Sequence, residues 1–182
     1  MVTFSATVLP VRGDLGNRIG DDELRNECNE FLSDDEISQF VNDVVGVPLL
    51  VEHNDNDVVG AVMASKRGVG GSVLIDCSID VATPRGRDVA DDVRNGALTG
   101  VSAGHRFRVS SLPDGTRRVD KEILEVSVCK DPARTGARIH EILEDEVRAS
   151  NTSKVYKRHQ MFTGVINAAK MNNIIRIFNK RI

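Results

Sequence analysis

His53 lies where an apolar segment meets a polar turn. Residues 47–52 are mostly Val and Leu and predict a strand, and residues 54–57, Asn-Asp-Asn-Asp, predict a turn. A strand end beside a loop is where a rigid scaffold presents catalytic groups. Imidazole is also the side chain best suited to accept a proton near neutral pH. His53 is therefore a candidate general base, although an exposed turn histidine with no catalytic role fits the same position.

Ser102 is the candidate nucleophile. It lies in Gly100-Val101-Ser102-Ala103-Gly104, where the small neighbours leave space around its hydroxyl for a substrate backbone. No helix is predicted directly after it, so the segment matches the nucleophile elbow of the α/β-hydrolases poorly. Glycine-flanked serines are common, and an ordinary strand serine remains an alternative.

Glu125 is a carboxylate inside the apolar run 123–128, Ile-Leu-Glu-Val-Ser-Val. A buried charge needs a partner, because burial without one is costly. A histidine would satisfy it, and a carboxylate that orients a histidine beside a serine is the arrangement of a serine hydrolase. Alternation in a strand puts Glu125 on the side of Ile123 and Ser127, so a solvent-facing Glu125 stays open.

The other polar motifs carry less chemistry. His105 is three residues after Ser102 and points to the other face of a strand, while His140 and His159 lie in predicted helices without a ligand-spaced partner. This pattern predicts no catalytic metal and no cofactor. The glycines at 68–71 are not followed by the Gly-Lys-Ser/Thr of a phosphate-binding loop.

The three cysteines, Cys28, Cys77 and Cys129, are far apart and predict free thiols rather than a disulfide framework. No apolar run is long enough to span a bilayer and the N-terminus does not resemble a signal peptide, which predicts a protein kept inside a cell or particle. Residues 1–150 carry a net charge of −10 and residues 151–182 one of +7. This shift predicts a domain boundary near residue 150.

The elements that must position these side chains are mostly strands. Strands are predicted at residues 3–11, 47–52, 58–64, 72–79, 98–109 and 117–128. Helical segments are predicted at residues 21–40 (with Ser33 as an N-cap and Glu36 completing a capping box), 88–95, 136–149 and in the basic tail. Successive short strands joined by turns favour a mainly antiparallel α+β fold over a doubly wound sheet.

Three segments together resemble the tailed-phage prohead proteases and herpesvirus assemblins. Residues 48–54 (PLLVEHN), followed by Val-Gly at 59–60, resemble the motif that ends in the catalytic histidine. Residues 95–104 (NGALTGVSAG) resemble the phage motif that leads to the nucleophilic Ser-x-Gly. Residues 124–133 are similar to the phage "EVSxV…PA" segment.

The resemblance implies a barrel-like fold of about seven mostly antiparallel strands surrounded by helices. It implies a serine endopeptidase of capsid maturation with Ser102 as nucleophile, His53 as base and Glu125 as third member. In the herpesvirus branch that third member is a histidine, so a carboxylate here leans toward the phage branch. An oxyanion hole would lie at Ala133 and Arg134.

The resemblance also implies partners and a location. Scaffold protein and major capsid protein would be the peptide substrates, in the procapsid interior of an infected host cell, and herpesvirus relatives suggest a homodimer. Residues 1–149 would form the protease domain. Residues 150–182 would form a basic helical extension or scaffold-linking tail, and Ala149–Ser150 is a candidate self-cleavage bond.

Two alternatives remain beside the peptidase. One is a catalytically inactive assembly protein that has kept the fold, and the other is a hydrolase of small esters or amides. The basic tail has few aromatic residues and no recognised module, which argues against nucleic-acid binding.

Overall fold

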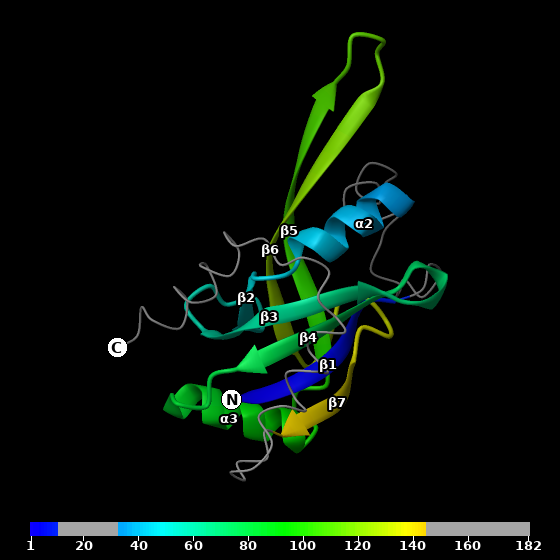
Figure 1. Cartoon of the computed structure of the whole chain (residues 1–182). Helices are drawn as coiled ribbons and strands as arrows, with labels where there is room; N and C mark the ends of the chain where they lie inside the picture. Colours follow the sequence, from blue (N-terminus) through cyan, green and yellow to red (C-terminus); the bar gives the residue numbers. More distant parts are fainter. Residues whose placement is uncertain (11–32, 145–182) are drawn as a thin grey trace.

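The computed structural model describes residues 1–10 and 33–144. In this part the chain forms a seven-stranded sheet, two α-helices and one short 3₁₀ helix (Figure 1). In chain order they are β1 (Val2–Leu9), α2 (Asp34–Asp43), β2 (Pro48–Val51), β3 (Val58–Arg67), η1 (Val69–Gly71), β4 (Val73–Ile79), α3 (Pro84–Arg94), β5 (Gly100–Ser111), β6 (Arg117–Cys129) and β7 (Ile139–Glu144).

The sheet order is β5-β6-β2-β3-β4-β1-β7. All neighbouring strands pair antiparallel except β2 and β6, which are parallel and set Leu49, Leu50 and Val51 beside Val126, Ser127 and Val128. This parallel pair joins two parts of the chain that are far apart in sequence. It places the end of β2, just before His53, beside the end of β6.

The seven mostly antiparallel strands confirm the predicted strand content, but the described residues form neither the predicted barrel nor a surround of helices, because the sheet does not close and only two α-helices pack on it. The sheet is open, with β5 and β7 as its edge strands. A bridge between Gly100 and Arg138 links the start of β5 to the segment that leads into β7. Next to this bridge, the backbone N–H of Val101 donates to Ala137 O at 3.1 Å.

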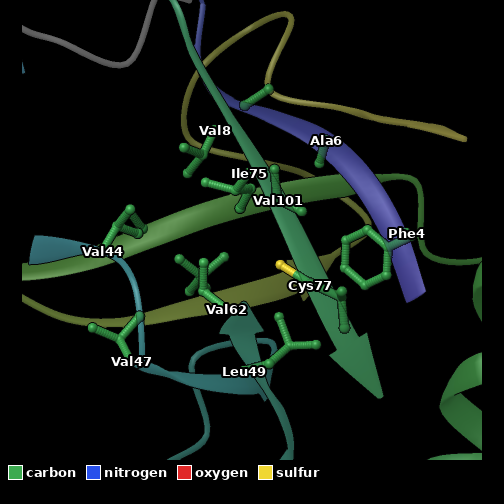
Figure 2. Close-up of a cluster of buried hydrophobic side chains, with 14 of the residues drawn as sticks. Phe4, Ala6, Val8, Val44, Val47, Leu49, Val62, Ile75, Cys77 and Val101 are labelled. Atoms are coloured by element: carbon green, nitrogen blue, oxygen red, sulfur yellow. The ribbon is translucent and has the colours of Figure 1, made fainter. Parts of the chain in front are cut away.

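Val, Ile and Leu side chains fill the core, as the scarcity of aromatic residues predicts. Figure 2 shows Phe4, Val62, Ile75, Cys77 and Val101 converging from several strands. The most deeply buried large side chains in this part of the chain are Phe4, Phe40, Leu49, Ile75 and Ile79. Strand residues thus dominate the packing, with α2 contributing one of the two large aromatic rings.

Helix α2 begins where the sequence predicts. The Ser33 side chain accepts from the N–H of Glu36, and the Glu36 carboxylate accepts from the N–H of Ser33, which is a complete capping box. Ile37 and Phe40 face the core. Residues 21–32, also predicted to be helical, lie outside the described residues.

Helix α3 begins four residues earlier than predicted. Thr83 is its N-cap and accepts from the N–H of Gly86, and Pro84 occupies the first turn, where proline is favoured. The predicted start at residue 88 is therefore wrong, because Thr83 and Pro84 already begin the helix. Gly96 follows the helix with a φ of 73° and ends it, as glycine often does after a helix C-cap.

The helix predicted over residues 136–149 is also wrong in its described part. Residues 139–144 form β7, which pairs antiparallel with β1. The pairing shifts register between Ser5 and Ala6, so Ile142 lies opposite Phe4 and Ile139 opposite Ala6, with His140 as an extra residue between the pairs. This bulge lets Ile139 and Ile142, three residues apart, both pack against the core.

The β5–β6 hairpin extends beyond the rest of the sheet as a two-stranded arm beside α2 (Figure 1). At its tip the N–H of Leu112 donates to Thr116 O at 2.8 Å, and Gly115 has a φ of 84°. Residues 113–115, Pro-Asp-Gly, form the turn between the two strands, as this turn-forming sequence favours. At its base the Lys121 ammonium contacts the Glu36 carboxylate of α2 at 2.5 Å. Among the residues described, neither helix has the length and hydrophobicity needed to cross a membrane.

Candidate active site

The turn after β2 presents His53. Glu52 and His53 have φ values of 49° and 58°, the left-handed region that most side chains avoid. Two hydrogen bonds frame this reversal: the N–H of Glu52 donates to Val128 O at 3.1 Å, and the N–H of Asn54 donates to Val51 O at 3.0 Å. Such strain persists only where the surroundings impose it, and it is concentrated at functional sites.

His53 and Glu125 are in contact. His53 Nδ1 lies 2.7 Å from Glu125 Oε1, although the residues are 72 positions apart in sequence. The histidine side chain is 47% exposed and the glutamate side chain 9%. An ionised carboxylate can only accept, so Nδ1 carries the proton and Nε2 holds a lone pair. The buried carboxylate therefore fixes the tautomer in which Nε2 can act as a base.

Ser127 completes the surroundings of the carboxylate. Its Oγ donates to Glu125 Oε2 at 2.7 Å and accepts from the backbone N–H of His53 at 3.0 Å. Ser127 is fully buried and Glu125 is 7% exposed. Each carboxylate oxygen thus has a hydrogen-bond donor, which compensates the cost of burying the charge.

A β-bulge decides which way Glu125 points. Gly104 pairs with Glu125 but His105 pairs with Ile123, so Leu124 is an extra residue on β6. The bulge breaks the alternation of the strand. Ile123 is buried in the core, whereas Glu125 shares a face with Ser127 and binds His53. The sequence argument left a solvent-facing Glu125 open, and the geometry excludes it.

Ser102 lies on the strand beside this pair. It is directly opposite Ser127 in the β5–β6 ladder and is 6% exposed. Opposite residues in an antiparallel pair project from the same face, so Ser102 shares the face of Ser127 and Glu125. Among the described residues, no hydrogen bond joins Ser102 Oγ to the His53 imidazole. In enzymes without bound substrate, the hydrogen bond between a nucleophile and its base is often too long to count, and it shortens only when substrate binds.

The loop that contains Ala133 and Arg134 contacts the chain next to both His53 and Ser102. At one side the N–H of Lys130 donates to Glu52 Oε1 at 3.0 Å. At the other, Pro132 packs on Gly100, where an added Cβ would lie 2.6 Å from the proline ring. The loop then turns, with the N–H of Ala137 donating to Arg134 O at 3.1 Å.

The remaining predicted groups lie elsewhere. His140 Nε2 is 2.6 Å from the Thr7 hydroxyl on the β1–β7 pair. Nowhere in residues 1–10 and 33–144 do three or more potential ligand side chains gather into a metal site. His159, Cys28 and the Ala149–Ser150 bond lie outside the described residues.

Cys77 and Cys129 are free and buried, as predicted. Cys129, at the end of β6, pairs with Gly100. Burial raises the pKa of the Cys129 thiol to about 12, and the carboxylates of Glu52, Asp131 and Glu125 add to this effect. The thiol therefore stays protonated near neutral pH and is a poor nucleophile.

Sequence reasoning missed three residues at the site: Ser127, Gly104 and Glu52. Ser127 was present in the same motif as Glu125, and a second polar residue at period two inside an apolar strand was the signal that could have found it. Gly104 follows the serine in the Ser-x-Gly motif. Its role depends on the cross-strand register, which the sequence does not reveal. For Glu52 the sequence carries no signal beyond its place before His53.

Several herpesvirus protease structures align over most of the chain. The varicella-zoster virus protease has 12% identity and a TM-score of 0.49, covering 100% of this chain and 91% of that one. The Kaposi's sarcoma-associated herpesvirus protease with a hexapeptide phosphonate inhibitor has 15% identity and a TM-score of 0.48, covering 100% and 90%.

A search of curated proteins finds no match. The family model described as caudovirus prohead serine protease matches residues 21–154, which include His53, Ser102 and Glu125. This match spans most of the sequence and confirms the resemblance seen in the motifs. The chain therefore belongs to the caudovirus prohead serine protease family.

Proposed function

We propose that the protein is a serine endopeptidase of capsid maturation, with Ser102 as nucleophile, His53 as general base and Glu125 as the residue that orients the base. The observation that carries this proposal is the 2.7 Å contact between His53 Nδ1 and the buried carboxylate of Glu125. The imidazole of His53 is half-exposed and held by a buried carboxylate, and Ser102 lies on the same face of the sheet as that carboxylate. A base oriented in this way near a serine is what nucleophilic catalysis requires.

In the proposed reaction, His53 Nε2 takes the hydroxyl proton of Ser102 while Oγ forms a bond to the scissile carbonyl carbon. The imidazolium that results is stabilised by Glu125. It then gives the proton to the leaving amine as the C–N bond breaks, which leaves an acyl-enzyme. A water molecule, deprotonated by the same imidazole, attacks the ester, and the proton returns to Ser102 Oγ.

The negative charge of the tetrahedral intermediate needs donors. We propose that the loop at Ala133 and Arg134 supplies them, either from a backbone N–H or from the Arg134 side chain. Pro132 of this loop packs on Gly100, two residues before the proposed nucleophile. Lys130, at the start of the loop, donates its N–H to Glu52, which precedes the proposed base. An oxyanion-hole donor of this kind is worth on the order of 3 kcal/mol of transition-state stabilisation.

The substrates that the family membership favours are scaffold protein and capsid protein, cleaved inside the procapsid, and the chain itself. A homodimer is part of this proposal, and sedimentation of the full chain tests it. Residues 1–149 would be the protease domain and residues 150–182 the extension removed by self-cleavage at Ala149–Ser150. Intact mass spectrometry of the wild-type chain and of Ser102→Ala tests that last point, because only the wild type should shorten.

A fluorophosphonate probe tests the activity without knowledge of the substrate. We expect it to label Ser102, as mapped by peptide mass spectrometry. His53→Ala should lower the labelling rate by at least about 100-fold, the scale of general-base catalysis. Ser111→Ala, on the exposed arm, is the matched control and should label normally. A chain that folds but shows no labelling at Ser102 would favour the inactive assembly protein.

A further inference from the structure

Ser127 forms hydrogen bonds with both His53 and Glu125, the proposed base and the residue that orients it. Its hydroxyl accepts from the backbone N–H of His53 at 3.0 Å and donates to Glu125 Oε2 at 2.7 Å, while Glu125 Oε1 contacts His53 Nδ1 at 2.7 Å. These three contacts form a closed ring of interactions, which runs from the backbone N–H of His53 through the Ser127 hydroxyl and the Glu125 carboxylate to the His53 imidazole. Within the described residues, the hydrogen-bond partners of the Glu125 carboxylate are His53 and Ser127.

We propose that Ser127 is a positioning residue of the active site, which holds the Glu125 carboxylate and the backbone of His53 in one fixed relation. This inference rests on the proposed function and adds a fourth member to its site. Ser127 acts through the other two residues and has no step of its own in the reaction.

Two features argue that the ring does more than satisfy a buried hydroxyl. First, His53 has a φ of 58°, an unfavourable conformation that the hydrogen bond from its N–H to Ser127 helps to hold. Second, a carboxylate with only one oxygen engaged can rotate about its terminal torsion, which is broad and weakly restricted. The Ser127 hydroxyl fixes the second oxygen, so that Oε1 remains aimed at Nδ1.

The strand register explains why a hydroxyl at this position suits the role. Ser127 lies opposite Ser102 and two residues from Glu125 on the same face, and it is fully buried. Parallel pairing with Leu50 sets it beside the end of β2, next to the turn that carries His53. A small side chain with one donor and one acceptor fits between the carboxylate and the backbone of the turn.

The test compares Ser127→Ala with Ser78→Ala in the full chain. Ser78 is also fully buried in a strand, and its hydroxyl donates to the sulfur of Met1, so the same atom is deleted away from the site. We expect Ser127→Ala to lower the fluorophosphonate labelling rate of Ser102 by about 10- to 100-fold, as for loss of a hydrogen bond to a charged group. Ser78→Ala should label at the wild-type rate.

A readout that does not depend on activity separates positioning from general stability. The His53 Nδ1 proton, bound to a carboxylate, should give a far-downfield proton NMR signal in the wild type. In Ser127→Ala we expect this signal to shift upfield or to broaden through exchange with water, and in Ser78→Ala to stay in place. Ser127→Thr keeps the hydroxyl on a residue that strands favour, and it should recover most of the labelling.

A double-mutant cycle with Glu125→Gln completes the test. In the Glu125→Gln background the Ser127 hydroxyl no longer has a carboxylate to hold and keeps only its bond to the N–H of His53, so removing it there should lower labelling by a smaller factor than in the wild type. Equal effects in both backgrounds, or an unchanged downfield signal in folded Ser127→Ala, would overturn the inference. Absence of Ser102 labelling in the wild type would instead overturn the proposed function, while the NMR comparison would still report on the ring.

Discussion

Gly104 lies opposite Glu125 across the β5–β6 pair, and the glutamate carboxylate fills the space that a side chain at Gly104 would need. A Cβ built on Gly104 would be 2.0 Å from Glu125 Oε1, the same oxygen that contacts His53. The glycine two residues after the proposed nucleophile therefore makes room for the residue that orients the proposed base.

Substitution of Gly104 tests this relationship. Gly104→Ala should displace the Glu125 carboxylate from His53 and lower fluorophosphonate labelling of Ser102 by at least about 100-fold, the scale of a lost catalytic base. Gly115→Ala is the control: an added Cβ would have nothing within 4 Å, and the φ of 84° makes the change cost about 1 kcal/mol of stability at the arm tip only. Normal labelling of Gly104→Ala would refute the steric argument.

The ion pair between Arg85 and Asp57 should matter for the turn that carries His53. Arg85 of α3 donates from Nε and Nη2 to both oxygens of Asp57, with an Nη2 distance of 2.6 Å. Arg85→Lys loses this fork, and we expect a loss of up to about 1 kcal/mol in stability together with slower labelling.

Arg94→Lys, in an exposed pair with Asp91 on the same helix, provides the comparison. The Arg94→Lys substitution should leave the midpoint of urea unfolding and the rate of Ser102 labelling nearly unchanged. If the two lysine variants behave alike, α3 does not support the turn.

Glu52 should hold the loop at residues 130–137 against the turn. Its Oε1 accepts from the N–H of Lys130 at 3.0 Å. Glu52→Ala removes this acceptor, and we expect a loss of about 1 kcal/mol in the free energy of unfolding and a lower labelling rate. Glu52→Gln keeps an acceptor oxygen and should retain most of both. Similar urea curves and rates for the alanine and glutamine variants would contradict this role.

The buried thiol of Cys129 should make stability fall at high pH. Its pKa is raised to about 12 in the folded chain, whereas an unfolded cysteine titrates near about 8.5. Stability from this group is complete below that lower value and is lost as the pH rises above it, because the unfolded state then releases the proton more readily.

Urea unfolding between pH 7 and 10 should show this decline, and Cys129→Ala should reduce its slope. At pH 8 we also expect iodoacetamide to alkylate Cys129 only in urea and to leave Ser102 labelling unaffected. Rapid alkylation of the native chain would contradict a protonated, buried thiol.

The sequence predicted most strands but failed where a bulge interrupts the period of two. Ile139 and Ile142 are three residues apart, which reads as helical spacing, yet both pack inward because the β1–β7 register shifts between them. The bulge at Leu124 has a similar effect: it changes the face of the strand on which Glu125 lies, so alternation along the sequence does not predict that face. Neither bulge has a local sequence signal, since each depends on the partner strand.

The early start of α3 is a different kind of miss. Thr83 and Pro84 are a favourable N-cap and first-turn pair, so the signal was present, but the helix was predicted to begin only at residue 88. His53, Ser102 and Glu125 were candidates from the sequence because they stand in recognisable motifs. Ser127, in contrast, gains its importance from the parallel β2–β6 pairing, a contact across 74 positions that only the fold provides.

That parallel pairing has a consequence for timing. The proposed base and the carboxylate that orients it are 72 positions apart in sequence, and they meet only after β6 has been added next to β2. A nascent polypeptide that has not yet emerged past Cys129 holds a histidine with nothing to orient it. If the proposed activity is correct, the geometry that it needs therefore forms only after this region has been translated and folded.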